Sequence, residues 1–262
     1  MFYLYVYTYD KKLMSKPLLS TKRSRTAAKR PSTRVRRGNE QDQLALRRAV
    51  LDAAMALFHE GGLDGVTMRG VATRVGVSAM ALYHYFPSKA ALLHGLWEAT
   101  ITELQADLNQ AIEAAGLDAH ARLRAWIDAF FSHFEARPDS YRLVFMLDTR
   151  QAEDDGDGAP VWGELPAYRE VLQAATALSR DVAQALGGDD DEARIRQAGE
   201  LRLVMTVGYL HSRLINTRYP WSDLAALRAT TIDLIVQAVA QCLTGQCPGD
   251  KAAPARPVRT RG

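Results

Sequence analysis

The stretch with the clearest chemical potential runs from Thr67 to Lys89 and reads TMRGVATRVGVSAMALYHYFPSK. Hydroxyl residues stand where two short helices would begin, and the second helix carries small residues followed by Tyr and His. Small side chains at its start let a helix lie deep in a DNA major groove, and the rings beyond can reach phosphates and base edges. An ordinary solvated surface would usually carry Glu and Lys instead. The pattern therefore favours a surface that binds nucleic acid.

Two short helices at a sharp angle would position these side chains. Thr67 is a suitable N-cap for a helix from Met68 to about Val75, and Gly76 can adopt the left-handed conformation that ends it. Ser78 can cap a second helix that runs from Ala79 to Phe86. The apolar residues of this region supply the buried sides of both helices: Val71, Val75, Val77, Leu82 and Phe86.

Further helices are expected on both sides of this pair. The segment from Leu44 to Glu60 has apolar residues at helical spacing, and Gly61-Gly62 would terminate it. Ser88 begins a longer helix that leads out of the unit. Residues 44–99 are thus predicted to form a three-helix helix-turn-helix domain with an outgoing connecting helix.

Taken together, these segments resemble the DNA-binding region of the TetR/AcrR family of bacterial transcriptional regulators. The residues that carry the resemblance are Ala49–Phe58, Gly61-Gly62, Val66–Arg69, Val71-Ala72, Val75–Ser78, Leu82–Phe86 and Ser88–Leu92. The resemblance implies phosphate contacts by Thr67, Ser78, Tyr83 and Lys89. It also implies that six residues lie nearest the base edges: Arg69, Ala79, Met80, Ala81, His84 and Tyr85.

Composition limits the class of protein. The chain has 262 residues, 47% of them hydrophobic, which permits one or two domains with a substantial core. No segment approaches the roughly 18 consecutive apolar residues of a membrane span, so we expect a cytoplasmic protein without a membrane partner. The two cysteines, Cys242 and Cys247, are too few for a disulfide framework or a zinc site.

Charge is distributed unevenly along the chain. Eleven Lys or Arg and no acidic residue lie between Lys11 and Arg37, whereas residues 100–249 carry a net charge of −9. Residues 1–43 are therefore predicted to be a disordered basic arm, which either follows DNA phosphates or is simply solvated. The opening MFYLYVYTY lacks the features of a secretory signal, and a translation start at Met14 would omit it. A second disordered tail is expected at 246–262.

Residues 100–245 read as helices throughout, so the predicted fold class is all-α. One of these helices is predicted to end near Arg137-Pro138, and its apolar stripe consists of Leu123, Trp126, Ile127, Phe130, Phe131 and Phe134. A mostly apolar pocket in this second domain would hold a small-molecule effector. The candidate ligand-binding residues are Trp126, Phe130, Phe134, Tyr141, Phe145, Met205 and Tyr209. His133 and His211 are polar candidates within apolar helices, but no metal-ligand spacing is found, and neither a metal nor another cofactor is expected. The segment from Gln151 to Pro166 is predicted to be a flexible acidic loop.

The last predicted helix, from about Ser222 to Leu243, is apolar on two sides. One stripe would face its own domain and the other a second copy of the chain. Together with the helix from Asp190 to Asn216, it predicts a homodimer, an arrangement that the family resemblance also implies. A two-fold pair would place its recognition helices roughly 34 to 36 Å apart, on a near-palindromic double-stranded operator.

The sequence thus favours a ligand-responsive transcriptional regulator, more readily a repressor than an activator. One alternative is a nonspecific DNA-organising protein without an effector. Another is an enzyme on a helical scaffold, although no nucleophile–base pair, phosphate loop or metal motif supports it.

Overall fold

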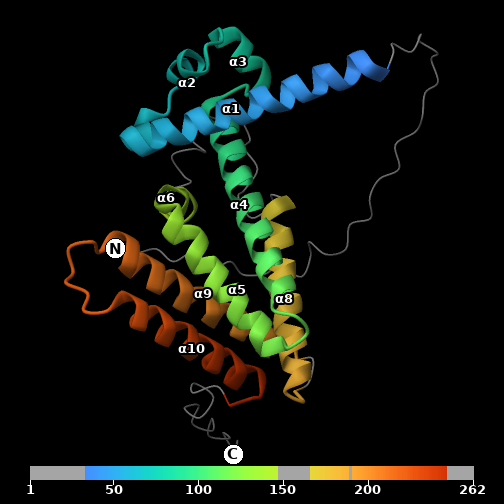
Figure 1. The fold of residues 1–262 in the computed structure, drawn as a ribbon, viewed down its shortest axis with the longest axis vertical. Helices are drawn as coiled ribbons and strands as arrows, with labels where there is room; N and C mark the ends of the chain where they lie inside the picture. Colours follow the sequence, from blue (N-terminus) through green and yellow to red (C-terminus); the bar gives the residue numbers. More distant parts are fainter. Residues whose placement is uncertain (1–32, 147–165, 189–190, 247–262) are drawn as a thin grey trace, which may run out of the picture. The chain divides into compact units, whose positions relative to one another are not determined.

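The computed structural model describes residues 33–146, 166–188 and 191–246. For residues 33–40 it describes the backbone alone. The chain divides into two compact units, Met1–Gln43 and Leu44–Gly262. Of the first unit, the described residues include only the start of one helix, so the fold below is that of the second. All regular structure in the described ranges is helical, which confirms the all-α prediction (Figure 1).

The described helices follow one another along the chain as in Figure 1. They are α1 (Thr33–Gly65), α2 (Met68–Val75), α3 (Ala79–Tyr85), α4 (Lys89–Ala114), α5 (Ala119–Ala136), α6 (Pro138–Phe145), α8 (Pro166–Ala185), α9 (Glu192–Ile215) and α10 (Leu224–Leu243). The expected acidic loop lies outside the described residues as far as residue 165, as do residues 1–32 of the basic arm and residues 247–262 of the tail.

Helix α1 is longer than its sequence pattern indicated. It begins at Thr33 instead of Leu44, so the last part of the predicted disordered arm is helical. The sequence has no proline between Pro31 and Pro87, and nothing stronger than a single glycine interrupts the helix before its double glycine. Gly61 and Gly62 do break the helical geometry, with Gly62 at φ +62°, but helical turns resume as far as Gly65.

Helices α2 and α3 form the predicted helix-turn-helix. Thr67 Oγ1 accepts a hydrogen bond from the Gly70 N–H at 3.1 Å, and Gly76 ends α2 in the left-handed conformation at φ +79°. Ser78 Oγ accepts from the Ala81 N–H at 3.1 Å and so caps α3, which ends at Tyr85, one residue earlier than predicted. The local cap and turn chemistry therefore fixes where both helices begin.

Helix α4 joins this unit to the remaining helices. Ser88 caps its start, and the helix continues for 26 residues to Ala114. Near its start Gly95 lies against Phe86, where a Cβ would come within 2.8 Å of the ring carbon Cε1. Glycine is needed there because the end of the helix-turn-helix packs directly on the α4 backbone. Farther along, α4 packs on α5 and α8.

Helix α5 is the central element of the second half, and it packs against α4, α6, α8, α9 and α10. Its large apolar side chains form the predicted stripe, and Ile127, Phe131 and Phe134 are completely buried. Helix α10 is long and apolar enough to cross a membrane by length and composition, but here it packs on α9 and carries the ion-paired residues Arg228 and Asp233. Packing within this fold accounts for only part of its apolar character, because Leu227 and Leu234 remain exposed.

Candidate nucleic-acid interface and effector region

The start of α2 combines a capped backbone with an unpaired cation. Arg69 is exposed and has no ion-pair partner among the described residues. Arg74, one and a half turns later, is instead held by Glu60 through two contacts of 2.9 and 3.0 Å. The hydrogen bond between them lowers the pKa of Glu60 and raises that of Arg74. Of these two arginines, Arg69 is the one available to a phosphate.

The outward side of α3 carries the side chains predicted to face DNA. Met80 is 82% exposed and Tyr83 is 49% exposed, while Ala79 and His84 also lie on the surface. Ala81 and Tyr85 are half-buried, and the Tyr85 ring meets the His84 ring edge-on at 5.7 Å. Leu82 and Phe86 hold the opposite side of the helix in the core. Because α3 is buried on this one side, its remaining side chains face outward.

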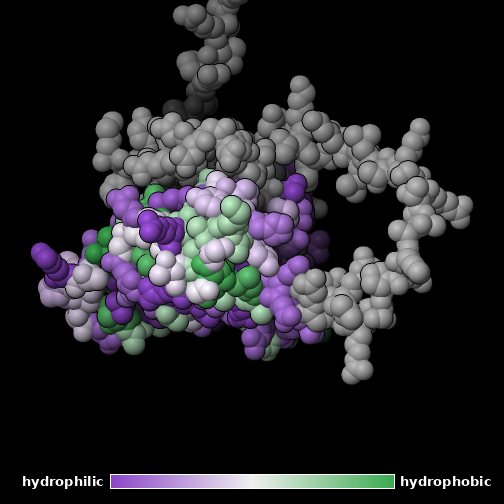
Figure 2. Space-filling model, turned by 90° about the horizontal axis from the view of Figure 1, so that it is seen from above, coloured by the Kyte–Doolittle hydropathy of each residue, from purple (hydrophilic) through white to green (hydrophobic). Residues whose placement is uncertain are grey.

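Figure 2 looks onto the end of the molecule that carries α2 and α3 in Figure 1. Hydrophobic and neutral residues gather toward the middle of the coloured surface, and hydrophilic ones border them.

Lys89 is placed differently from its predicted role. Its Nζ donates a hydrogen bond of 2.8 Å to the Leu63 carbonyl, in the turn that follows Gly62, and the side chain is partly buried. The ammonium group thus ties the start of α4 to the end of α1. Two of its three protons are not used by that bond, so a phosphate contact stays a prediction, but the residue has a structural role that the sequence did not indicate.

Five of the seven predicted effector residues form one aromatic cluster. Trp126 stacks on Phe130 with ring centroids 5.2 Å apart, and Phe130 meets Phe134 at 5.1 Å. Tyr141 and Phe145 of α6 complete the cluster, at 5.8 and 5.5 Å from Phe134. Burial raises the pKa of Tyr141 to about 12, so its hydroxyl stays neutral. It donates a 3.4 Å hydrogen bond to the Val207 carbonyl of α9.

Tyr209 of α9 packs on a different part of α5. Its ring stacks on Phe131 at 4.2 Å, and its hydroxyl donates to Glu135 at 2.9 Å. Burial is the main cause that raises its pKa well above the ordinary value, with the Glu135 contact in support. Met205 is half-buried against the core. No ring contact between Tyr209 and the five-ring cluster is found among the described residues, although both lie in one buried hydrophobic core, so a shared effector site for all seven residues stays a prediction.

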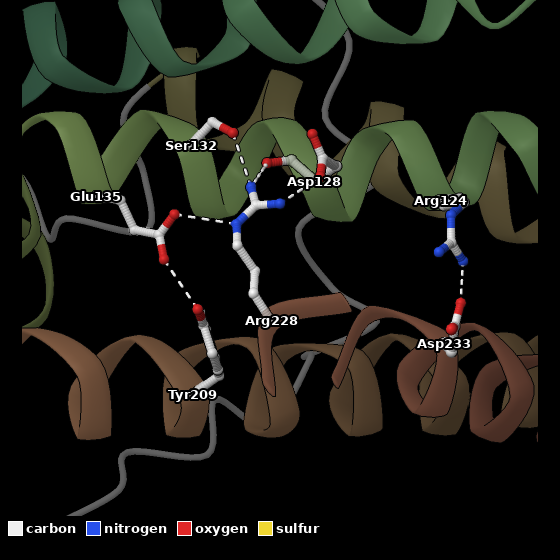
Figure 3. Close-up of polar contacts among 7 residues, drawn as sticks. All are labelled: Arg124, Asp128, Ser132, Glu135, Tyr209, Arg228 and Asp233. Atoms are coloured by element: carbon white, nitrogen blue, oxygen red, sulfur yellow. Dashed lines mark hydrogen bonds and ion pairs between the residues drawn. The ribbon is translucent and has the colours of Figure 1, made fainter. Parts of the chain in front are cut away.

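Around Tyr209, a polar network joins α9 and α10 to α5 (Figure 3). Arg228 of α10 contacts Glu135 at 3.1 Å, the Asp128 carboxylate at 2.5 Å and Ser132 at 2.8 Å. Burial works against its charge, but the hydrogen bonds and negative charges of Asp128 and Glu135 raise its pKa. Arg124 of α5 also pairs with Asp233 of α10. This network fixes α10 and α9 on the opposite side of α5 from α4.

Another contact links the helix-turn-helix region directly to the second domain. His59 Nδ1 on α1 lies 2.5 Å from Asp139 Oδ2 on α6, and Asp139 also accepts from Arg142 at 2.9 Å. Helix α6 also supplies Tyr141 and Phe145 to the aromatic cluster. Local sequence patterns do not predict this pair, because its members are eighty positions apart in the chain.

The structure also contains a buried arginine that sequence reasoning missed. Arg202 of α9 is only 5% exposed, among the aromatic side chains of α5 and the backbone of α8. Periodicity could have found it, because Arg202 falls on the same helical stripe as Ala198 and Thr206, both completely buried. Among the described residues, no group of three or more His, Cys, Asp or Glu is arranged to hold a metal ion.

Comparisons with known proteins agree with this geometry. The family model for bacterial regulatory proteins of the tetR family matches residues 50–96. The chain is 51% identical over 185 residues to the HTH-type transcriptional repressor KstR of Mycobacterium tuberculosis, covering 56% of this chain and 83% of that one. It is 34% identical over 130 residues to the HTH-type transcriptional activator FasR of Mycolicibacterium smegmatis, covering half of this chain and 59% of FasR.

Solved structures show the same fold at lower identity. A Rhodococcus sp. RHA1 protein of unknown function superposes with a TM-score of 0.61 at 21% identity, covering 75% of this chain and 96% of that one. The regulator FadR of Bacillus subtilis, solved in complex with stearoyl-CoA, gives 0.56 at 18% identity, covering 72% and 97%.

Fold, helix-turn-helix geometry and relatives together define a DNA-binding transcriptional regulator, which rules out the enzyme alternative. The chain belongs to the tetR family of bacterial regulatory proteins.

Proposed function

We propose that this regulator acts in the cytoplasm as a homodimeric repressor, which a small apolar or aromatic effector releases from a near-palindromic operator. The observation that carries the proposal is the exposed side of α3, where Met80 stands 82% in solvent between two small residues. The position of this exposed methionine supports the proposal, because the small residues on either side of it admit the helix to a major groove.

Exposed apolar side chains on α9 and α10 support the homodimer. Leu203 and Val204 of α9 are 47% and 55% exposed, and Leu227 and Leu234 of α10 are 38% and 52% exposed. The two helices pack on each other, so these side chains are carried by neighbouring elements (Figure 1). The opposite stripe of α10, with Ile235 and Val239 completely buried, faces its own domain. A second copy would cover the exposed stripe.

We infer repression by analogy with KstR, which has the higher sequence identity of the two named relatives. KstR, at 51% identity, is a repressor, whereas FasR, at 34%, is an activator. The aromatic cluster around Phe130 supports an apolar or aromatic effector, because it offers an apolar environment. The FadR complex with stearoyl-CoA demonstrates that this fold can hold a ligand with a long apolar chain in another protein.

Coupling between effector and operator has two physical routes in the structure. Helix α4 runs from the helix-turn-helix to α5, and the His59–Asp139 contact joins α1 to α6. An effector among the rings of α5 and α6 would shift either helix and alter the spacing of the paired α3 helices. A coupling of about 1 to 3 kcal/mol is enough to change operator occupancy 5- to 150-fold.

The decisive experiment selects bound fragments from genomic DNA with the purified protein. The proposal expects recovery of one or a few near-palindromic sites whose binding weakens in the presence of an effector. Recovery of unrelated sequences, with steep salt dependence and no common motif, would support the nonspecific DNA-organising alternative.

A variant pair tests the dimer in the same preparation. Leu234→Glu places a charge on the exposed stripe of α10 and should yield monomers in sedimentation analysis. Leu117→Glu, at a position 98% exposed in the turn between α4 and α5, is the matched control and should remain dimeric. A dimer that survives Leu234→Glu would place the interface elsewhere.

A further inference from the structure

Helix α9 buries a positive charge inside the second domain. The buried stripe of this helix passes through Ala198, Arg202, Thr206 and Leu210, and Arg202 is only 5% exposed. Burial lowers its pKa to about 10, which still leaves the guanidinium protonated at neutral pH. A permanent cation therefore stands at a position where the helical pattern calls for an apolar side chain.

No carboxylate neutralises this cation among the described residues. Its hydrogen bonds go to the Ala175 carbonyl, at 3.3 Å from both terminal nitrogens, and to Ser179 Oγ at 3.4 Å. These bonds are long, and both acceptors are uncharged. Ser179 already donates to the same carbonyl at 3.0 Å. A buried guanidinium normally has a carboxylate or phosphate partner, so Arg202 has unused capacity to bind an anion.

The charge borders the aromatic cluster. The guanidinium carbon lies 4.5 Å above the Trp126 ring centroid, and Trp126 stacks in turn on Phe130. The ring contacts continue from Phe130 to Phe134 and Phe145. One continuous set of side chains thus has a cation at one end and only aromatic surface along the rest.

We propose that Arg202 is the anion-binding residue of the effector site, so that the effector is an amphiphilic acid with an apolar or aromatic body. Its carboxylate or phosphate oxygens would replace the long contacts to Ala175 and Ser179 with a bidentate pair, and its body would lie along Trp126 and Phe130. This inference rests on the proposed function, because it describes the effector of that same domain.

A purely structural role makes a different prediction for stability. If Arg202 served mainly to tie α9 to α8, Arg202→Met would lower the melting temperature of the ligand-free protein. If its charge is retained for a ligand, removing an uncompensated buried cation leaves the melting temperature unchanged or raises it. Arg196→Met, at an exposed position on the same helix, is the matched control and should melt like the parent.

Binding is tested with probes that share a body and differ in the head group. Decanoate, decyl phosphate and 4-phenylbutyrate are compared with 1-decanol and 4-phenyl-1-butanol, by calorimetry on the dimeric protein without DNA. We expect the parent to prefer acids over the matched alcohols, and Arg202→Met to lose at least about tenfold in affinity for the acids. Affinity for the alcohols should not change. Arg202→Lys should keep a weaker preference for acids, because it preserves the charge without the planar fork.

Three results would overturn the inference. They are equal binding of the acids by parent and Arg202→Met, equal binding of alcohols and acids by the parent, and no binding of any of the three acids. A preference for decyl phosphate over decanoate would identify a phosphate head group, and the reverse a carboxylate. Because no DNA is present, these outcomes are independent of the genomic selection that tests the proposed function.

Discussion

The helix-turn-helix and the second domain use aromatic and apolar side chains in opposite ways. On α3, Tyr83 is 49% exposed and Met80 is 82% exposed, and capped helix ends hold them outward. On α5 and α6, Phe134 and Tyr141 are completely buried within a cluster of rings. The difference separates two properties, because the α3 side chains proposed to recognise DNA are exposed and add little to folding, whereas the side chains that hold the fold are buried.

Charge follows the same division. Arg69 in α2 is exposed and carries its charge without a desolvation cost, while Arg202 in α9 is buried with only uncharged hydrogen-bond partners. The first can bind and release a phosphate freely, with a strength that salt reduces. The second would bind an anion strongly but only inside the domain. Substitutions in the two regions should therefore affect different measurements.

The largest expected effect is on folding. Phe134→Ala removes a ring that contacts Phe130, Tyr141 and Phe145, and should lower the free energy of unfolding by about 3 to 5 kcal/mol in urea titrations. Tyr219→Ala, at a position 61% exposed after α9, should cost far less. Equal losses in the two variants would mean that the aromatic cluster does not stabilise the fold.

The next effect is on DNA binding alone. Met80→Glu places a carboxylate on the side of α3 that is proposed to face DNA, and should weaken operator binding at least about 100-fold because the charge is repelled by the nucleic acid. Its melting temperature should remain that of the parent, because the side chain is solvated. Leu117→Glu adds the same charge at an exposed position distant in sequence and should keep the parent affinity. If Met80→Glu bound the operator as tightly as this control, α3 would not be the recognition helix.

Helix caps sharpen the comparison, because the side-chain acceptor of an N-cap can be removed from one helix in each region. Ser78→Ala removes the acceptor for the Ala81 N–H of α3, and Asp118→Ala removes that for the Ala121 N–H of α5. Each should cost about 1 kcal/mol of stability by urea unfolding. Only Ser78→Ala should also weaken operator binding. A loss of DNA affinity in both variants would indicate that general destabilisation is being measured.

The smallest expected effect is a dependence of stability on pH. Burial lowers the pKa of His133 from 6.5, although its hydrogen bond to Asp107 opposes the shift. The unfolded chain then binds the proton more readily, so the stability contributed by neutral His133 is present above pH 6.5 and is lost as pH falls toward the lowered value. His133→Gln should flatten that part of the stability profile; an unchanged slope would show that other groups cause it.

The sequence was most informative where structure is local. The caps at Thr67 and Ser78 and the left-handed turn at Gly76 lie where predicted, because each depends on residues within one helical turn. The buried stripe of α5 followed equally from its spacing. Helix α1 was predicted too short, because composition indicated an arm where no strong breaker interrupts the helix.

The contacts that define the second domain could not be predicted in the same way. Arg228 contacts Asp128, which lies one hundred residues earlier in the chain, and Lys89 donates to the Leu63 carbonyl, a bond that its sequence neighbours do not predict. Arg202 looked like any surface arginine in the sequence, and only the packing of α8, α9 and α5 shows that it is buried. Tertiary packing selects the partners of long charged side chains, and local spacing does not contain that information.

The central claim is that two copies of α3 lie in successive major grooves. Guanine N7 is a major-groove atom, so methylation protection on the selected operator tests the claim directly. We expect two protected patches whose centres lie about 10 base pairs apart, one helical turn, both lost with Met80→Glu. Protection that is absent, confined to a single patch, or unchanged in that variant would contradict the account.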